Sequence, residues 1–288
     1  MNSAILRSLE DKKRAFPLIF HIFEPPKSMI QPLAYVHPTA KIADNVTIDP
    51  FVTIHSNVEI GEGTHVMSGA IIFKGARIGK NCRIFPGASI GAIPQDLKFD
   101  GEETLTIIGD NTTVREYVTI NKGTKAQGYT KVGENVLLMA YVHLAHDCIV
   151  EDNCILANSV QVAGHVHIGE WAILGGAALV HQFVKIGRHA MISGGSLVRK
   201  DVPPYTKAAR EPLSYEGVNS IGLRRRNFTT EKIGEIQDIY RNLFVKGYNT
   251  AKAIKIIETE FAPTTERDEI LQFIKESDRG IMKGYITK

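Results

Sequence analysis

The sequence is poor in cysteine and has no long run of apolar residues. Its three cysteines are an odd number without paired spacing, which argues against a disulfide framework and favours a reducing compartment. No apolar segment approaches the roughly 20 residues that span a bilayer, so we expect no membrane span. The apolar residues around Leu18 are interrupted by Pro17 and His21, and they lack the small-residue cleavage site of a signal peptide. We therefore expect a cytoplasmic protein.

A strong excess of one charge is also missing. The formal net charge is only +3, whereas a protein that binds nucleic acid usually carries a concentrated basic stripe. The short basic run of Arg224, Arg225 and Arg226 is by itself weak evidence for an anionic ligand. We therefore expect no nucleic-acid partner.

The sequence does contain a six-residue repeat. From Val132 to Pro203 every unit opens with an aliphatic residue, and its fifth place is small or β-branched. The same period runs from Val36 to Ile90, and two further units start at Ile108 and Val114. A short fixed period is typical of a solenoid. Each unit would form a short strand and a corner, and three units would form one triangular coil of eighteen residues.

The repeat predicts a mainly β protein, with a parallel β-helix over residues 29–210 and a small C-terminal α-helical domain over 211–288. Segments 96–107 and 121–131 break the period, so we expect them to project from the solenoid as exposed loops. The cysteines all fall on the inward fifth place, where they should serve as small core residues: Cys82, Cys148 and Cys154.

Both ends of the chain depart from the repeat. Residues 1–28 do not share it, and we expect either that Met29 is the native start or that 1–28 is a loosely attached extension. After Pro203 the apolar residues follow a helical period in three segments: Thr229 to Phe244, Thr250 to Phe261, and Thr265 to Ser277. Three such helices would close the open end of the solenoid and cover its unpaired strand edge.

Polar residues gather on one face of the predicted coils. His146, Gly164 and Gln182 each stand third in their unit and lie eighteen residues apart. They should therefore stack at about 4.8 Å per coil. His165 and His181 flank this column, so several histidines converge on one edge of three consecutive coils.

These residue types suit general-base catalysis. Histidine side chains in general titrate near working pH, and the adjacent Asp147 could orient the ring of His146. The backbone N–H of Gly164 could contribute to an oxyanion hole. The column contains no serine or cysteine, so direct attack by a substrate hydroxyl fits better than a covalent enzyme intermediate.

Spacing alone leaves two alternatives open. His143, His146 and His165 could supply three zinc ligands, as the histidines of trimeric hexapeptide-repeat carbonic anhydrases do. The chain could also be a solenoid scaffold without catalytic activity.

Several ordered motifs resemble one family. Four segments are similar to the UDP-N-acetylglucosamine 3-O-acyltransferases, which catalyse the first step of lipid A biosynthesis: 93–98 (IPQDLK), 143–148 (HLAHDC), 163–165 (AGH) and 180–183 (VHQF). Residues 217–226 look like the nucleotide-binding region of these enzymes. The likeness runs from about residue 29 to the C-terminus. An alternative within the superfamily is the later N-acyltransferase that acts on a UDP-3-O-acyl-glucosamine.

The resemblance implies a left-handed β-helix and a homotrimer with its sites between neighbouring solenoids. The reaction would transfer a (R)-3-hydroxyacyl group from acyl carrier protein to the glucosamine 3-hydroxyl of UDP-N-acetylglucosamine. The acyl group would arrive on the phosphopantetheine of the carrier, and neither a further cofactor nor a metal is expected. Asp96 lies well before the column in the sequence, so we expect it to reach the site from an adjacent subunit.

The resemblance also implies roles for single residues. His146 would be the general base, Asp147 its orienting partner and Gly164 the oxyanion donor. Substrate contacts are implied for ten residues: Gln95, Asp96, Lys98, His143, His165, His181, Gln182, Asn219, Arg225 and Arg226. Gly194 would be a ruler for the acyl chain, and glycine at this position favours a long chain. Ile221 stands where some relatives have glutamate, which would remove one ribose contact.

Overall fold

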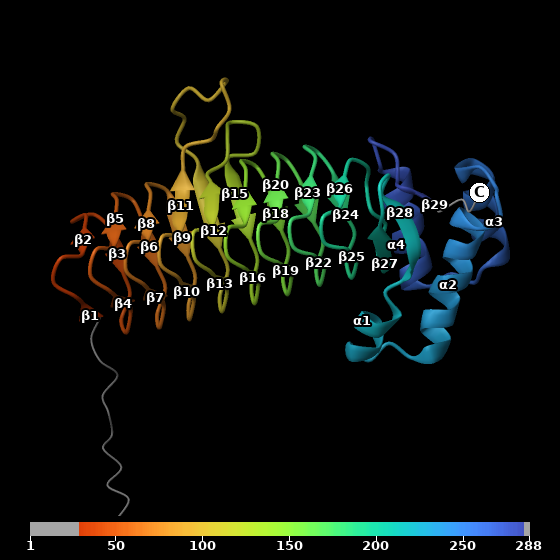
Figure 1. Cartoon of the computed structure of the whole chain (residues 1–288), viewed down its shortest axis with the longest axis horizontal. Helices are drawn as coiled ribbons and strands as arrows, with labels where there is room; N and C mark the ends of the chain where they lie inside the picture. Colours follow the sequence, from red (N-terminus) through yellow and green to blue (C-terminus); the bar gives the residue numbers. More distant parts are fainter. Residues whose placement is uncertain (1–28, 285–288) are drawn as a thin grey trace, which may run out of the picture.

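The solenoid predicted from the repeat dominates the structure, which is a computed structural model that describes residues 29–284. Three parallel sheets run along its length, and each coil adds one short strand to each sheet (Figure 1). Because every third strand belongs to the same sheet, paired residues such as His143 and Gln161 are eighteen apart in the sequence. The predicted fold class, a left-handed parallel β-helix followed by a small helical region, is confirmed.

The three sheets, which we call A, B and C, form the three sides of the prism. Sheet A has twelve strands, β1 (Met29–Ile30), β4 (Thr47–Ile48), β7 (His65–Val66), β10 (Arg83–Ile84), β13 (Thr113–Val114), β16 (Leu137–Leu138), β19 (Ile155–Leu156), β22 (Ile173–Leu174), β25 (Met191–Ile192), β27 (Thr206–Ala209), β28 (Ser214–Val218) and β29 (Lys283–Gly284). Sheet B has nine strands, β2 (Tyr35–Val36), β5 (Thr53–Ile54), β8 (Ile71–Ile72), β11 (Ser89–Ala92), β14 (Thr119–Asn121), β17 (His143–Leu144), β20 (Gln161–Val162), β23 (Leu179–Val180) and β26 (Leu197–Val198). Sheet C has eight strands, β3 (Lys41–Ile42), β6 (Glu59–Ile60), β9 (Ala76–Ile78), β12 (Leu105–Ile108), β15 (Tyr129–Val132), β18 (Ile149–Val150), β21 (His167–Ile168) and β24 (Lys185–Ile186).

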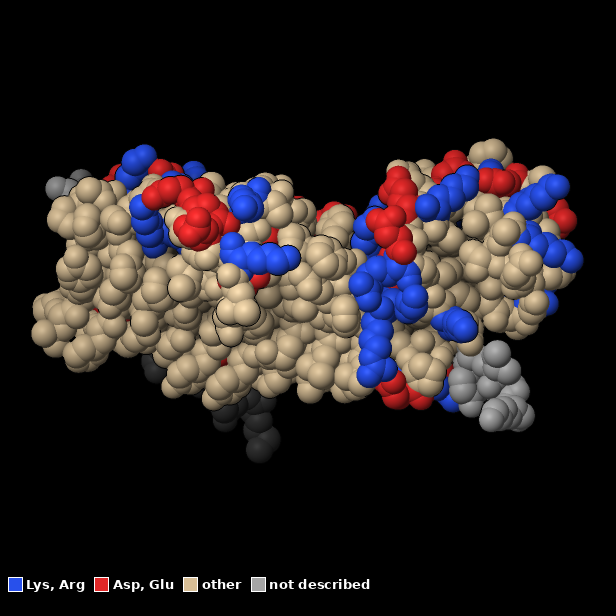
Figure 2. All heavy atoms as spheres, turned by 90° about the horizontal axis from the view of Figure 1, so that it is seen from above, with Lys and Arg blue, Asp and Glu red and all other residues tan. Residues whose placement is uncertain are grey.

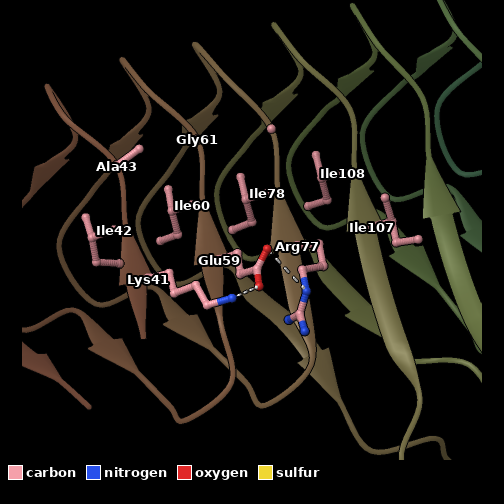
Figure 3. A pocket seen from close by; sticks show the side chains of 11 residues that line it. Lys41, Ile42, Ala43, Glu59, Ile60, Gly61, Arg77, Ile78, Ile107 and Ile108 are labelled. Atoms are coloured by element: carbon pink, nitrogen blue, oxygen red, sulfur yellow. Dashed lines mark hydrogen bonds and ion pairs between the residues drawn. The ribbon is translucent and has the colours of Figure 1, made fainter. Parts of the chain in front are cut away.

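The aliphatic residues that open each unit fill the interior of the prism. Figure 3 shows four of them as a ladder in sheet C, with one residue from each coil: Ile42, Ile60, Ile78 and Ile108. A fully buried side chain of this kind contributes about 1.5–3 kcal/mol of hydrophobic free energy. Because the ladders continue through successive coils, the core is one long column rather than a sphere.

The cysteines belong to this core, as predicted. Cys82, Cys148 and Cys154 are free thiols and fully buried. Burial raises the pKa of Cys148 and Cys154 to about 12, so their thiols stay protonated and unreactive.

The corners of the prism depend on a left-handed backbone at the fourth place of the unit. Asparagine, which tolerates this conformation, occupies many of these places: Asn45, Asn57, Asn81, Asn111, Asn135 and Asn153. Asp147, His165 and Phe183 take the same conformation, with φ of 60°, 59° and 65°. Their side chains therefore leave successive coils at the same corner.

Two loops interrupt the repeat, but their boundaries differ from the prediction. Residues 105–107 and 129–131 pair as strands in β12 and β15, so the predicted loops 96–107 and 121–131 are too long at their C-terminal ends. The first loop spans residues 93–104 and the second 122–128. Period alone could not show this, because the paired residues precede the next aliphatic position. Both loops leave from sheet B and return to sheet C, and both project from the same corner (yellow in Figure 1).

Sheet A extends beyond the solenoid into the C-terminal region. β27 pairs with β25, β28 turns back antiparallel to β27, and β29 adds to β28 near the end of the described chain. The boundary predicted between residues 210 and 211 thus falls within the β27–β28 hairpin. Residues 1–28, for which an extension is predicted, lie outside the described residues.

Three of the four helices match the segments expected from the helical period. They are α2 (Thr230–Phe244), α3 (Thr250–Glu260) and α4 (Thr265–Lys275), capped by Thr229, Asn249 and Thr264. The short helix α1 (Ser220–Arg225) was not predicted. Within residues 29–284, no helix combines the length and the apolar character of a membrane-spanning segment.

A ring stack joins the solenoid to the C-terminal region at the corner between sheets C and A. His189 is 2% exposed and stacks between Trp171 and Tyr205, with ring centroids 6.4 and 5.6 Å away. The edge of Phe228, which follows α1, packs against the same imidazole. Burial, with the charges of Arg188 and Arg226, lowers the pKa of His189 from 6.5 to about 3.

The buried His189 predicts a loss of stability in mild acid. In the unfolded chain His189 takes up a proton near pH 6.5, whereas in the folded chain it does so only near pH 3. Folding stability therefore falls as pH drops through this window, by up to about 1.4 kcal/mol per pH unit. We expect His189→Asn, which tolerates the left-handed backbone, to be less stable at pH 7 but to lose less stability between pH 6.5 and 4.5. Urea unfolding at both pH values measures this difference, and parallel losses in the two proteins would contradict it.

Candidate active site

The predicted polar column lies at the corner between sheets B and C. His146 sits between β17 and β18, Gly164 between β20 and β21, and Gln182 between β23 and β24. The two projecting loops leave from this same corner in the preceding coils. The loops and the column therefore form one continuous edge of the molecule.

His146 and Asp147 form a buried hydrogen-bonded pair. The distance from His146 Nδ1 to Asp147 Oδ2 is 2.8 Å, and the two residues are 8% and 2% exposed. Because an ionised carboxylate can only accept, Nδ1 is the donor, which leaves Nε2 as the acceptor atom of the neutral ring.

The second loop holds the Asp147 carboxylate in place. Thr124 donates its backbone N–H to Oδ1 at 2.8 Å and its hydroxyl to Oδ2 at 2.7 Å. The backbone N–H of Asp147 in turn donates to the hydroxyl of Thr130 at 2.8 Å. Burial alone would raise the pKa of Asp147, but the hydrogen bonds from His146 and Thr124 outweigh it and hold the pKa below its usual value. The carboxylate is thus kept ionised beside the imidazole.

His165 completes the cluster from the next coil. Its Nε2 lies 3.5 Å from Asp147 Oδ2, and its ring meets the His146 ring edge to face with centroids 5.1 Å apart. The other face of the ring stacks on Phe183 at 4.7 Å. Burial lowers the pKa of His165 despite the opposing charge of Asp147, so this ring is neutral at pH 7.

Gly164 faces the His146 ring with no room for a side chain. A Cβ on Gly164 would lie 2.8 Å from both Cε1 and Nε2 of His146. No backbone carbonyl within residues 29–284 accepts the N–H of Gly164. The N–H groups of His146 and Gln182 also have no backbone acceptor, so the residues at the third place of these three units share this property. What distinguishes Gly164 is its missing side chain, which allows the His146 ring to lie directly against its backbone.

Thr124 gives a testable prediction for this arrangement. We expect Thr124→Val to lower kcat by about tenfold or more, because it removes one hydrogen bond to a charged group while preserving the shape of the side chain. Loss of that donor also raises the pKa of Asp147, so the acidic limb of the pH–rate profile should move to higher pH. Thr124→Ser retains the hydroxyl and should behave as the wild type. Equal activity of the valine and serine variants would contradict this role.

His143 lies beside the cluster rather than in it. It belongs to β17, and its Nδ1 is 2.7 Å from the hydroxyl of Thr119. Burial lowers its pKa, so it is neutral at pH 7. The alternative zinc set of His143, His146 and His165 is therefore not assembled within residues 29–284. The ligand atoms that do converge, within 4.8 Å of one another, belong to His146, Asp147 and His165.

The first loop brings its predicted residues to the same edge. Gln95 and Lys98 are exposed, Asp96 is half-buried, and the Asp96 carboxylate accepts the N–H of Lys98 at 3.0 Å. Asp96 is near enough to His165 for its charge to raise the pKa of that ring. The expectation that Asp96 reaches the site of an adjacent subunit stays a prediction, although the loop that carries Asp96 also leaves from the corner between sheets B and C in its own chain.

The predicted nucleotide residues lie elsewhere on the chain. Asn219 caps α1 and is 3% exposed; its side chain donates to the carbonyl of His189 and accepts from the N–H of Gly222. Arg226 lies over the Trp171 ring at 4.7 Å, whereas Arg225 is exposed. α1 sits at the corner between sheets C and A, on the side opposite the loops (Figure 1).

The remaining predicted residues occupy two corners. His181 is exposed and Gln182 half-buried at the corner between sheets B and C. Gly194 lies at the third corner, between sheets A and B, where a Cβ would meet the carbonyl of Gly176 at 3.0 Å. A single chain thus brings together the predicted catalytic residues and the loop residues but separates them from Gly194 and from the residues of α1.

Two other surfaces offer less chemistry. A shallow depression of about 520 Å³ covers the outer face of sheet C near the N-terminal end. Figure 3 shows that its charged residues pair with one another, since Glu59 accepts from Lys41 at 2.8 Å and lies 3.7 Å from Arg77. The C-terminal pocket of about 470 Å³ is lined by Leu213 and Met282 among others. Neither contains the histidine cluster.

Sequence reasoning missed the residues that hold the site together. Thr124 and Thr130 support Asp147, Thr119 supports His143, and Phe183 supports His165. Phe183 could have been found, because it follows Asp147 and His165 by whole coils. Thr124 could not, because it lies in a loop outside the period.

Comparison with known proteins agrees with this geometry. A family model described as UDP N-acetylglucosamine O-acyltransferase, domain 2, matches residues 201–282, and one for the bacterial transferase hexapeptide matches 129–164. A third model, the GMPPB C-terminal domain, matches 30–126.

The following matches extend over nearly the whole length of the related proteins. The acyl-[acyl-carrier-protein]–UDP-N-acetylglucosamine O-acyltransferase of Thiobacillus denitrificans is 42% identical over 88% of this chain and 99% of its own. The protein of the same name from Leptothrix cholodnii is 43% identical over 89% of this chain and 100% of its own. The solved UDP-N-acetylglucosamine acyltransferase of Bacteroides fragilis is 50% identical, with a TM-score of 0.87 over 88% of this chain and 100% of that one. The Francisella novicida enzyme is 42% identical, with a TM-score of 0.86 over 88% of this chain and 94% of that one. The chain therefore belongs to the UDP-N-acetylglucosamine O-acyltransferase family.

Proposed function

We propose that the protein transfers a (R)-3-hydroxyacyl group from acyl carrier protein to the 3-hydroxyl of UDP-N-acetylglucosamine, the first step of lipid A biosynthesis, in the cytoplasm. The observation that carries this proposal is the buried His146–Asp147 pair, whose imidazole packs directly against Gly164, where there is no side chain. Family membership supports the identity of donor and acceptor. The acyl group comes on the phosphopantetheine of the carrier, and no further cofactor takes part.

The geometry favours general-base catalysis by His146. Its Nε2 accepts the proton of the sugar 3-hydroxyl as the oxygen attacks the thioester carbonyl. Asp147 holds the ring in the required tautomer and stabilises the imidazolium that forms. The N–H of Gly164 donates to the oxyanion of the tetrahedral intermediate. As the intermediate collapses, the pantetheine thiolate leaves and takes the proton from His146, which restores the enzyme.

The other predicted contacts follow the layout of the edge. Gln95, Asp96 and Lys98 reach the catalytic corner from the first loop and would hold the sugar and the acyl donor, together with the neutral rings of His143 and His165. His181 and Gln182 extend the same surface by one coil. Gly194 would set the end of the acyl pocket, and its small size favours a long chain.

We further propose a homotrimer in which each site is shared by two subunits. Arg225, Arg226 and Asn219 would contact the nucleotide, although they lie at a different corner from His146 in their own chain. Three parallel prisms around one axis would bring the α1 corner of one subunit to the catalytic corner of the next. Arg225 is the best placed of the three for a diphosphate, because it is exposed and its guanidinium binds oxygens in pairs.

Subunit complementation tests the shared site. His146→Ala and Arg225→Ala homotrimers should both be nearly inactive. Trimers that mix the two variants should recover activity. With random equal mixing, an intact His146 and an intact Arg225 would meet in about one quarter of the sites. If the mixtures stay as inactive as the parents, each site is formed within a single chain.

An acyl-transfer assay tests the function itself. Purified protein should acylate UDP-N-acetylglucosamine from 3-hydroxyacyl carrier proteins, and a donor series should show a preference for long chains. A 3-amino sugar nucleotide and UDP-3-O-acyl-glucosamine serve as competing acceptors. Transfer only to the amine of UDP-3-O-acyl-glucosamine would assign the later N-acyltransferase reaction instead.

A further inference from the structure

The catalytic edge continues beyond Gln182 to a group of cations. Arg199 and Lys200 turn the same corner, from sheet B toward sheet C, in the last coil of the solenoid. This corner is two residues shorter than the others, because Val202 pairs with Ile186, sixteen residues away instead of eighteen. Both Arg199 and Lys200 are exposed.

A segment from the C-terminal region adds a third cation. The carboxylate of Asp201 accepts the hydroxyl of Ser277, and its backbone pairs with that of Ile281, so the connecting residues lie against the last coil. Arg279 belongs to this segment and is half-buried. Its carbonyl accepts the Lys200 ammonium, and its guanidinium reaches the carbonyl of Arg199 at 3.5 Å. Arg199, Lys200 and Arg279, which we call the basic cluster, are thus held side by side.

The basic cluster is only partly neutralised. Among the ion pairs of residues 29–284, Arg199 pairs with Glu211, whereas neither Lys200 nor Arg279 has a carboxylate partner. Figure 2 shows a blue stripe across the molecule at the junction of the solenoid and the helices, with acidic side chains beyond both of its ends. Between the basic cluster and His146 the edge consists of uncharged groups, among them Gly164, Gln182 and Phe183.

The spacing along this edge matches the arm of a carrier protein. Three coils separate His146 from Lys200, which corresponds to about 14 Å at the spacing of paired strands. A pantetheine arm, with roughly 13 atoms along its chain, spans about 15 Å at the rise of an extended polypeptide. With the thioester at His146, the phosphate that links the arm to its carrier would lie beside the basic cluster.

We propose that Arg199, Lys200 and Arg279 form the docking surface for the acidic acyl carrier protein, three coils from the base that its thioester must reach. This inference rests on the proposed acyl transfer and adds the place from which the donor enters. Opposite charge raises the association rate and fixes the orientation of the partner. The carrier would therefore sit against the C-terminal end of the edge, while its arm follows the corner back to His146.

A comparison of two donors tests the docking surface. Lys200→Glu and Arg279→Glu, separately and together, are assayed with 3-hydroxyacyl carrier protein and with the carrier-free 3-hydroxyacyl phosphopantetheine. For the double variant we expect kcat/KM with the carrier protein to fall by at least about tenfold, because like charges would then face each other. Turnover of the carrier-free donor should stay within about twofold of the wild type. Lys246→Glu, a charge reversal at an exposed lysine beyond the end of α2, should change neither value.

Each result has a separate meaning. Equal losses with both donors would overturn the proposal, since the basic cluster would then act on the fold or on the reaction. Unchanged kinetics with both donors would place the carrier elsewhere. Lys200→Gln and Arg279→Gln, which remove charge without reversing it, should reduce the salt dependence of KM for the carrier protein. A wild-type protein that transfers from neither donor would instead refute the proposed function.

Discussion

Replacement of His146 by alanine is expected to lower kcat by about 10³-fold, the contribution typical of a positioned general base. The reason lies in the geometry of the pair. Asp147 accepts from Nδ1, so Nε2 is the atom left for the substrate hydroxyl, and it lies directly against Gly164. KM for the nucleotide should change little, because the proposed nucleotide contacts come from α1. Steady-state kinetics with carrier-bound donor measures both quantities.

His167→Ala is the matched control for this experiment. His167 is also a solenoid histidine paired with a carboxylate, since its Nε2 lies 2.7 Å from Glu151. It belongs to the outer face of sheet C and takes no part in the proposed site. Its replacement should leave kcat unchanged. Near-normal turnover of His146→Ala would remove this residue as the base, whereas a comparable loss in His167→Ala would point to a general effect on the solenoid.

Gly164→Ala is expected to have the second-largest effect, with activity reduced by about a hundredfold. The new methyl group would lie 2.8 Å from two atoms of the His146 ring, closer than side chains approach one another. The ring cannot turn away without breaking its bond to Asp147. The added methyl should also lower the free energy of unfolding by about 1–3 kcal/mol, as overpacking does.

A double-mutant cycle separates this clash from other effects of the methyl group. In a His146→Ala background the ring is absent, so Gly164→Ala should no longer destabilise the fold. Thermal or urea unfolding of the four proteins gives the coupling energy. A destabilisation that is equally large in both backgrounds would mean that the methyl group disturbs the coil itself rather than the imidazole.

The period of the repeat predicted most of the fold for a physical reason. Each inward position is repeated in every coil, so Ile60, Ile78 and Ile108 occupy equivalent places in the core and indicate the same burial three times. The position of His146 relative to Gly164 follows from the same eighteen-residue spacing. The helices α2 and α4 could also be predicted, because Thr229 and Thr264 cap them where the apolar pattern begins.

Features without a period could not be predicted in this way. The bond from Thr124 to Asp147 joins a loop to a coil, and no spacing in the sequence relates them. The β27–β28 hairpin continues sheet A with an antiparallel strand, which leaves no hexapeptide signal. α1 is too short to show a helical pattern, so the location of Asn219 at its cap was hidden as well.

The triangular coil also determines which changes in length the chain can accept. A deletion of six residues from the solenoid would move every later residue to a neighbouring corner, and the base would part from the groups that follow it. A deletion of eighteen would preserve the corner but bring the two ends of the edge one coil closer together. Extra length placed between β11 and β12, or between β14 and β15, disturbs neither relation, because the chain returns to the position from which it left. Insertions in these two loops therefore enlarge the site without changing the eighteen-residue spacing that aligns its residues.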